Sequence, residues 1–347
     1  MNTTHIFDSP DEVVAALSAP GIQRAAYVSR HRQVPSTRID WPHIHDSKFA
    51  AINLDGPYHT ELNRLLVEAL RASYPQAVSK ALIVAAQQLA KTPQRAAFDV
   101  QRTVIVPTAA ELVARMLFGD LEDAPRLSDL MVSIYFAGPG EVEPLIERVL
   151  LLLQRTIGAT GGTAEDGKCI QTLLSRVPDR RFAYVNAAAF ATAGFQNLAA
   201  VTGSALSHCL SDCNLCNGVS DVERGHVLRS LSFQHECFAR EACTDLQIGA
   251  AQIRTGDEVR LQLDSADRLL EQIVLADVNP AIGGSEQTFK FGWGPHRCPA
   301  AEVSSDFVFT MIGLVKRAHP GSKVQSTVAD VAQIVRPIEI LLAQLTS

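Results

Sequence analysis

The chain has 347 residues, 47% of them hydrophobic and 20% charged, which supports a large buried core. Its formal net charge is −6 and it has no block of basic residues, which argues against nucleic acid as the main partner. We expect no secretory leader and no membrane span, because no apolar run reaches about 18 residues. The seven unevenly spaced cysteines favour reduced thiols, so the sequence predicts a cytoplasmic protein.

Most of the predicted elements along the chain are helices. Residues 10–17 have helical periodicity, and an amphipathic helix follows residues 55–64 up to Arg71. Residues 185–210 form a long, nearly all-apolar stretch, which is typical of a buried helix. Residues 221–231 are predicted to be helical, and residues 238–259 read as short strands and turns. The patterns predict a mainly α chain with small β-sheets.

The most informative stretch is Phe291-Gly292-Trp293-Gly294-Pro295-His296-Arg297-Cys298-Pro299-Ala300. Two glycines and a proline predict a tight irregular loop. Pro299 then opens an apolar-periodic run, so Cys298 is expected at the N-terminus of a helix. Free backbone N–H groups and the helix dipole at that position favour a thiolate and predict a lowered thiol pKa. A thiolate in such a loop is a candidate axial ligand for heme iron.

The pattern Phe-Gly-x-Gly-x-His-x-Cys resembles the heme-binding signature of the cytochrome P450, or heme-thiolate, family. The glycine that usually follows two residues after the cysteine is Ala300 here. The resemblance covers roughly residues 10–347 and implies one domain over residues 1–347, with the cytochrome P450 fold. It also implies that the helix and strand before residues 10–17 are absent, so that the fold is trimmed at its N-terminus.

The resemblance implies heme b (iron protoporphyrin IX) as the cofactor, with Cys298 as the metal ligand. Three residues in distant segments match positions that bind the heme propionates: His59, Arg240 and His296. Phe291 and Gly292 belong to the same cofactor-binding set. At the position of a further propionate-binding arginine this chain has Asn63, with Arg64 next to it. The segment with Trp41, His43 and His45 would cover the distal face of the heme, although the two histidines leave a metal site open as an alternative.

The helix at residues 185–210 departs from the family pattern. Where the family has Ala-Gly-x-acid-Thr, this chain keeps Ala193 and Gly194 but has Gln196 and Asn197. Neither amide titrates near neutral pH, so the usual proton relay is missing. We therefore expect Gln196, Asn197 and Thr192 to line an atypical distal site. The alternative, that Gln196 and Asn197 only satisfy a bend in the helix, stays open.

A second departure concerns the helix at residues 221–231. The family carries Glu-x-x-Arg there, and this chain has His226 and Arg229. No arginine lies between Arg268 and Arg297 to supply the third member of the family's ion-pair network. We expect this buried network to be mostly dismantled, at a cost to heme affinity.

The resemblance implies a heme-thiolate oxidoreductase of monooxygenase type that acts on a small or medium-sized specialised metabolite. The atypical distal residues leave oxidation, peroxide use, and rearrangement or dehydration at the iron open. A ferredoxin and its reductase are the expected redox partners if dioxygen is used. The alternative is a catalytically silent heme-binding or scaffold protein. A remote third hypothesis is an iron–sulfur cluster on Cys209, Cys213 and Cys216, whose spacing suits such a cluster.

Overall fold

The computed structural model describes residues 2–24, 51, 54–93, 97–138, 140–159, 169–177, 179–211, 221–231, 239–275, 288–329 and 338–344. The predictions made for Trp41, His43, His45, Cys213 and Cys216 lie outside these residues. The chain divides into two compact units. The first contains the described residues up to Arg64 and from Asp221 to Ala301, and the second contains the others.

The first unit is built on a four-stranded sheet of order β1-β7-β4-β2. Strand β1 (Thr4–Phe7) runs parallel to β7 (Glu258–Leu261). Strand β4 (Arg240–Ala242) is antiparallel to both β7 and β2 (Ile22–Gln23). A separate hairpin joins β5 (Leu246–Ile248) to β6 (Ala251–Ile253). The expectation that no strand precedes the helix at residues 10–17 is therefore wrong. Strand β1 precedes it and forms one edge of the sheet by pairing with β7.

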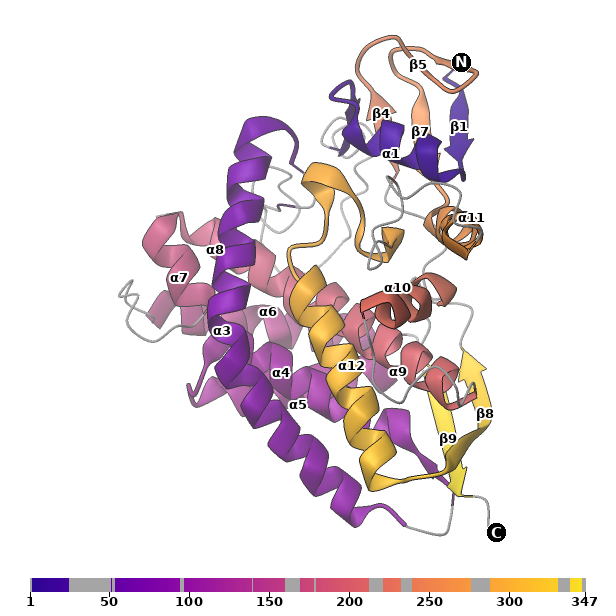
Figure 1. Cartoon of the computed structure of the whole chain (residues 1–347). Coiled ribbons are helices and arrows are strands. Elements are labelled where there is room, and N and C mark those ends of the chain that lie inside the picture. The colour runs from indigo at the N-terminus through magenta and orange to yellow at the C-terminus, as the bar shows by residue number, and fades with distance from the viewer. Residues whose placement is uncertain are drawn as a thin grey trace. The chain divides into compact units, whose positions relative to one another are not determined.

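In the described part of the first unit, the start of α3 (Gly56–Lys91, in this unit up to Arg64), three whole α-helices and two 3₁₀ turns accompany the sheets (Figure 1). The whole elements are α1 (Pro10–Ser18), α10 (Asp221–Ser230), α11 (Leu263–Leu275), η5 (Phe289–Phe291) and η6 (Gly294–His296). Helix α1 starts with a proline at its first position and acidic residues in its first turn, as the sequence predicts. The core between sheet and helices is apolar and includes Phe7, Val13, Leu17, Val259, Leu270 and Phe289.

The second unit is mostly helical. Its helices are α3 (Gly56–Lys91, in this unit from Leu65), α4 (Val106–Phe118), α5 (Asp123–Phe136), α6 (Val142–Ala159), α7 (Cys169–Arg176), α8 (Arg180–Ala189), α9 (Phe195–Ser211) and α12 (Ala301–Ala318). Two segments are π-helical: η2 (Gln101–Ile105) directly precedes α4, and η4 (Phe190–Gly194) lies between α8 and α9. The only sheet in the described part of this unit has the order β3-β9-β8, formed by β3 (Phe98–Asp99), β9 (Ile338–Gln344) and β8 (Ser322–Ala329).

Helices α3 and α12 lie side by side in the second unit (Figure 1). The Tyr74 hydroxyl donates a hydrogen bond of 2.6 Å to the carboxylate of Asp306, and Arg71 forms a bidentate pair with Glu302. Deeper in the unit, the Gln101 amide donates to the Tyr135 hydroxyl at 2.9 Å. These contacts hold together helices that lie far apart in the sequence.

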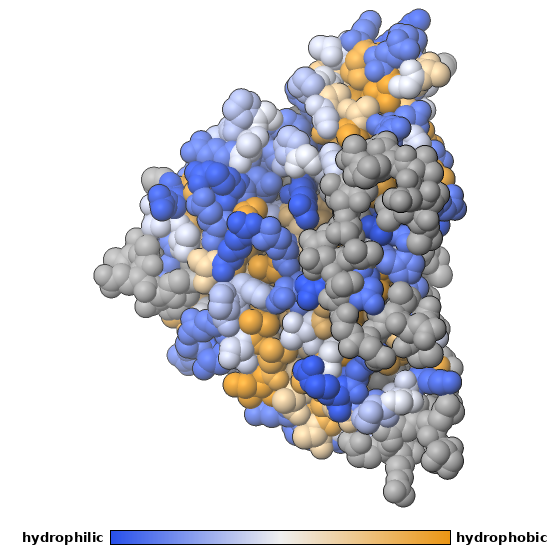
Figure 2. Space-filling model, viewed as in Figure 1, coloured by the Kyte–Doolittle hydropathy of each residue, from blue (hydrophilic) through white to orange (hydrophobic). Residues whose placement is uncertain are grey.

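Hydrophilic side chains cover much of the described surface seen in Figure 2. The large apolar side chains that remain exposed are spread over several elements: Ile6, Tyr58, Ile83, Leu151 and Leu269. Single exposed apolar side chains of this kind are normal in globular proteins. Among the described residues, none of the helices combines the length and the hydropathy that crossing a bilayer requires.

Candidate functional site

The cysteine loop of the first unit (residues 288–300) is closed by its own backbone. The Cys298 N–H donates to the Phe291 carbonyl at 2.6 Å, and the Arg297 N–H donates to the Gly294 carbonyl at 3.1 Å. Gly292 has a φ of 72°, and a Cβ there would lie 2.9 Å from the His296 carbonyl oxygen. A glycine is therefore required at position 292 for both its conformation and its size. The tight loop predicted from the glycines and the proline is confirmed.

Cys298 lies directly before helix α12, because the Ala301 N–H donates to the Cys298 carbonyl at 3.1 Å. The pKa of its thiol is nevertheless not lowered. Burial raises the pKa of the Cys298 thiol, and a hydrogen bond from the Ala300 N–H and the charge of Arg297 only partly offset this effect. The predicted low thiol pKa is wrong for the protein alone, because desolvation outweighs the helix terminus.

His59 and His296 stack on each other in the first unit, with ring centroids 4.3 Å apart and an angle of 19° between the ring planes. His296 Nε2 is 2.9 Å from a carboxylate oxygen of Asp55. Burial, followed by the charge of His296, lowers the pKa of His59 to about 4, so His59 is neutral at pH 7. The structure thus brings together two of the three residues predicted to bind propionates.

Arg240 is the third of these residues and lies on β4, opposite Val259 of β7. It is buried, and its charge contributes to the lowered pKa of His59. Two buried nitrogens in this region, Nε of Arg240 and Nδ1 of His59, have no hydrogen-bond partner in the described structure. A buried guanidinium and an imidazole with unused hydrogen-bonding capacity fit an anionic group such as a heme propionate.

Asn63, at the position where the family pattern has an arginine, binds the cysteine loop instead. Its amide donates to the carbonyls of Pro295, at 3.1 Å, and Arg297, at 3.3 Å. The side chain therefore ties the start of helix α3 to the loop that carries Cys298. The sequence identified this departure but not its role, because a backbone acceptor more than 230 residues away leaves no local signal.

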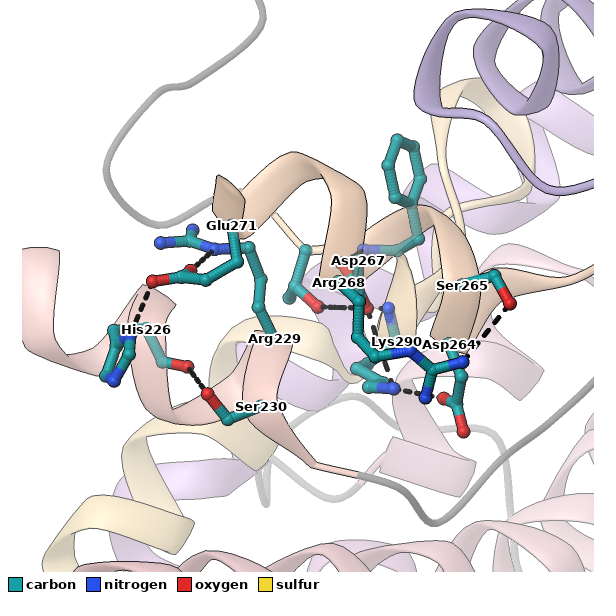
Figure 3. A network of polar contacts seen from close by, with 11 residues as sticks. His226, Arg229, Ser230, Asp264, Ser265, Asp267, Arg268, Glu271 and Lys290 are labelled. Atoms are coloured by element: carbon teal, nitrogen blue, oxygen red, sulfur yellow. Dashed lines mark hydrogen bonds and ion pairs between the residues drawn. The ribbon is translucent and has the colours of Figure 1, made fainter. Parts of the chain in front are cut away.

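The ion-pair network expected to be dismantled is rebuilt on helix α11 (Figure 3). The carboxylate of Glu271 accepts from His226 and from Arg229, whose side chain is fully buried. Burial alone would raise the pKa of Glu271, but these two hydrogen bonds hold it below its usual range. The expectation of a mostly lost network is wrong, because the acid comes from another helix.

Two further carboxylates of α11 hold the segment that precedes Cys298 (Figure 3). Asp264 pairs with Lys290, and an oxygen of Asp267 lies 3.8 Å from the same ammonium. Asp267 also accepts from the Phe289 N–H at 2.8 Å and from the Thr288 hydroxyl at 3.0 Å. The spacing of Asp264, Asp267 and Glu271 places them on one face of the helix. That spacing is the signal that sequence reasoning missed.

The predicted distal residues lie in the second unit, on the continuous helix formed by α8, η4 and α9. The π-helical turn at Phe190–Gly194 ends just before Gln196 and Asn197, the two residues that differ from the family pattern, and such turns often occur at functional sites. Thr192, Gln196 and Asn197 are half-buried, whereas Phe195 and Leu198 are buried. The Thr192 hydroxyl donates to the Ala188 carbonyl at 2.8 Å. The three predicted distal side chains therefore lie on one partly accessible stretch of the helix, which also contains the exposed Ala193.

No group of three or more potential metal-ligating histidine, cysteine, aspartate and glutamate side chains occurs among the described residues. Cys209 is buried, and the other two cysteines of the remote cluster hypothesis lie outside the described part.

Neither a protein-family model nor a curated protein sequence matches the chain. Solved structures do match it over nearly its whole length. The LnmA cytochrome P450 hydroxylase from the leinamycin biosynthetic pathway of Streptomyces atroolivaceus has a TM-score of 0.77 at 20% identity, covering 97% of this chain and 89% of its own. Epothilone B-bound cytochrome P450epoK has a TM-score of 0.77 at 16% identity, covering 99% and 91%.

P450BioI, solved in complex with an acyl carrier protein ligated to hexadec-9Z-enoic acid, is a third such structure. Its TM-score is 0.75 at 17% identity, and the match covers 97% of this chain and 91% of that one. The solved neighbours thus include hydroxylases and monooxygenases of small molecules. Agreement in backbone over 97–99% of the chain, at low identity, identifies the architecture. The chain has the cytochrome P450 fold.

Proposed function

We propose that the chain is a heme-thiolate oxidoreductase of cytochrome P450 type that acts on a small or medium-sized specialised metabolite. The observation that carries the proposal is the closed loop around Cys298, next to a buried set of anion-binding side chains in the same unit. The hydroxylase neighbours from biosynthetic pathways support the substrate class. When bound, heme b would supply oxidation at a thiolate-ligated iron.

The residues of the first unit have distinct roles in this proposal. Cys298 is the metal ligand, and Phe291 and Gly292 shape the loop that presents it. Arg240 supplies positive charge to a propionate, and His59, neutral at pH 7, supplies a hydrogen bond. His296, paired with Asp55, completes the set. Glu271 and Lys290 hold the neighbouring helix and loop in place.

The distal residues support an atypical reaction. Gln196 and Asn197 can orient a ligand by hydrogen bonding, but neither amide takes up or releases a proton near neutral pH. The Thr192 hydroxyl already donates to a backbone carbonyl. Peroxide use, or a rearrangement or dehydration, needs less proton delivery from the protein than dioxygen activation does. If dioxygen is used, we expect electrons from a ferredoxin and its reductase.

Replacing Arg240 by leucine is expected to lower heme affinity by roughly 10- to 100-fold, because one charge-assisted hydrogen bond to a propionate is lost. The heme-free protein should not be destabilised, because the substitution also removes a buried guanidinium nitrogen that lacks a partner. Hemin titration followed by absorbance measures the first effect, and thermal unfolding of the heme-free protein measures the second. The exposed Arg254 of the same unit provides a matched control, Arg254→Leu. Unchanged hemin affinity together with a large loss of stability would assign Arg240 a purely structural role.

The second candidate function is that of a catalytically silent heme protein. The amides of Gln196 and Asn197, in place of the acid and alcohol of the family pattern, favour it. It predicts a heme spectrum without turnover, whether hydrogen peroxide or reduced ferredoxin is supplied. Our proposal predicts conversion of a metabolite with hydrogen peroxide, with reduced ferredoxin and dioxygen, or, for a rearrangement or dehydration, with neither. Product formation from a metabolite, measured under each of these three conditions, separates the two candidates.

The double substitution Gln196→Asp with Asn197→Thr restores the acid and alcohol of the family pattern. If the native reaction bypasses dioxygen activation, this variant should not raise native turnover. We expect unchanged peroxide-supported rates, measured side by side with the unsubstituted protein. A large gain in dioxygen-dependent turnover would instead indicate an ordinary monooxygenase whose relay has been lost.

A further inference from the structure

Helices α5 and α6 of the second unit line an open hollow of about 470 Å³. A short connection joins the two helices, and Arg155 near the end of α6 pairs with Asp123 at the start of α5, so they are antiparallel. Each helix contributes four residues at helical spacing. The hollow therefore follows the seam between the two helices and is separate from the residues assigned to the heme.

The lining of the hollow is positively charged in a chain whose net charge is −6. Arg126, Arg148 and Arg155 face it, together with Asp129. Arg155 pairs with Asp123, and Arg126 lies 3.9 Å from the same carboxylate. One carboxylate thus faces two guanidinium groups at this end of the seam. An excess of positive charge remains after both aspartates are counted.

Arg148 lies toward the other end of the seam. Arg148 is exposed, and its guanidinium forms no ion pair with another described residue. A planar guanidinium without a carboxylate partner is well suited to bind an oxyanion through two parallel hydrogen bonds. Its position on the lining, away from the Asp123 pair, makes it the natural place for an anionic head group.

Between the two ends, leucines from both helices line the hollow beside the exposed Asp129. Leu151 has half of its surface exposed, at 50%, and Leu130 is half-buried. The lining residues of one helix span seven positions, which corresponds to about 10 Å along the helix. The volume of the hollow lies in the range of small-molecule sites.

We propose that this seam binds a small amphipathic oxyanion, an organic phosphate or carboxylate with a short apolar body. The head group binds Arg148, and the body packs on Leu130 and Leu151 toward Arg126 and Arg155. The combination of charge and apolar surface selects such a ligand over a bare inorganic anion or an uncharged alcohol. None of the residues assigned to heme lines this site, so a failure to bind such an oxyanion would not contradict the proposed heme-thiolate function.

Calorimetric titration of the full chain with four probes tests this site. The probes are n-octyl phosphate, octanoate, inorganic phosphate and n-octanol, all below the concentrations at which they form micelles. We expect saturable binding of at least one of the two octyl anions, and clearly weaker binding of phosphate and octanol. The stronger of the two anions identifies the head group. Binding of phosphate or octanol as tight as that of both octyl anions would overturn the amphipathic assignment, as would the absence of saturable binding.

Variants locate the binding. Arg148→Gln should weaken binding of the preferred octyl anion by about tenfold or more, because a charge-assisted hydrogen bond is lost. Leu151→Ser should weaken it less, and Arg176→Gln, at an exposed arginine on α7 outside the seam, should leave it unchanged. Arg148 is exposed, so thermal unfolding of this variant should match that of the unsubstituted protein. Binding that survives Arg148→Gln would lie elsewhere, for example in a substrate pocket, and would refute the assignment.

Discussion

Replacing Cys298 by alanine is expected to abolish the thiolate-type heme spectrum of the protein. Cys298 is the cysteine of the closed loop, at the position that the family pattern assigns to the iron ligand. Desolvation raises the pKa of the Cys298 thiol in the heme-free protein, so ligation to a heme iron would have to offset the cost of forming the thiolate. The measurement is the absorption spectrum of the reduced protein with carbon monoxide, after reconstitution with hemin.

Two controls keep this result interpretable. Cys298→Ser retains the shape of the side chain and tests whether the loop still folds, as judged by circular dichroism and thermal unfolding. Cys243→Ala removes a cysteine of similar, intermediate exposure in the same unit and should leave the spectrum unchanged. An alanine variant at position 298 that kept the full thiolate spectrum would contradict the ligand assignment and, with it, the proposed function.

Features that depend on local chemistry were predictable from the sequence. The loop around Gly292 and the start of α1 depend on the conformational preferences of glycine and proline, and these residues can be recognised in the sequence. The long helix over residues 185–210 follows from its apolar composition, although its π-helical turn does not. The resemblance also placed His59 and His296 in one predicted set, because the motifs that carry them are local, but it did not predict that their rings stack.

Features that depend on tertiary contacts were missed. The acid that pairs with Arg229 lies 42 residues away on another helix, so a search for Glu-x-x-Arg on one helix could not find it. The prediction of a lowered pKa for the Cys298 thiol was wrong for the same reason. Desolvation depends on the residues that pack over Cys298, and its neighbours in the sequence do not reveal them. That the two units form a single domain over residues 1–347 stays a prediction, as do the roles of the site residues.

Replacing Lys290 by methionine is expected to cost about 3–5 kcal/mol of stability near neutral pH, because it leaves buried carboxylates without their cation. The Lys290 side chain is fully buried between Asp264 and Asp267, which are themselves buried. Methionine has a similar length and an apolar end, so the loss reports the charge rather than a cavity. Urea unfolding, with equal m-values as the test of a two-state comparison, measures it.

The size of this loss should depend on pH. Burial raises the pKa of Asp267 from its ordinary value of 3.8 to about 6, against the opposing effect of Lys290. Since the folded-state pKa is the higher one, the contribution of Asp267 to stability falls as pH rises between these values. Removing the lysine raises the folded-state pKa further. The variant should therefore be destabilised more near pH 7 than near pH 5, where Asp267 is largely protonated.

Asp267→Asn in the Lys290→Met background should recover part of the lost stability, because it removes one uncompensated charge while an amide can still accept from the Phe289 N–H. The exposed Lys91→Met serves as the control for loss of a lysine as such. An equal loss near pH 5 and near pH 7 would show that Lys290 does not act through the charge of Asp267, and would leave its pair with Asp264 or its packing as the source of the loss. Because Lys290 lies in the segment that leads into the Cys298 loop, the charge mechanism further requires hemin affinity to fall in the single variant and to recover with stability in the double variant.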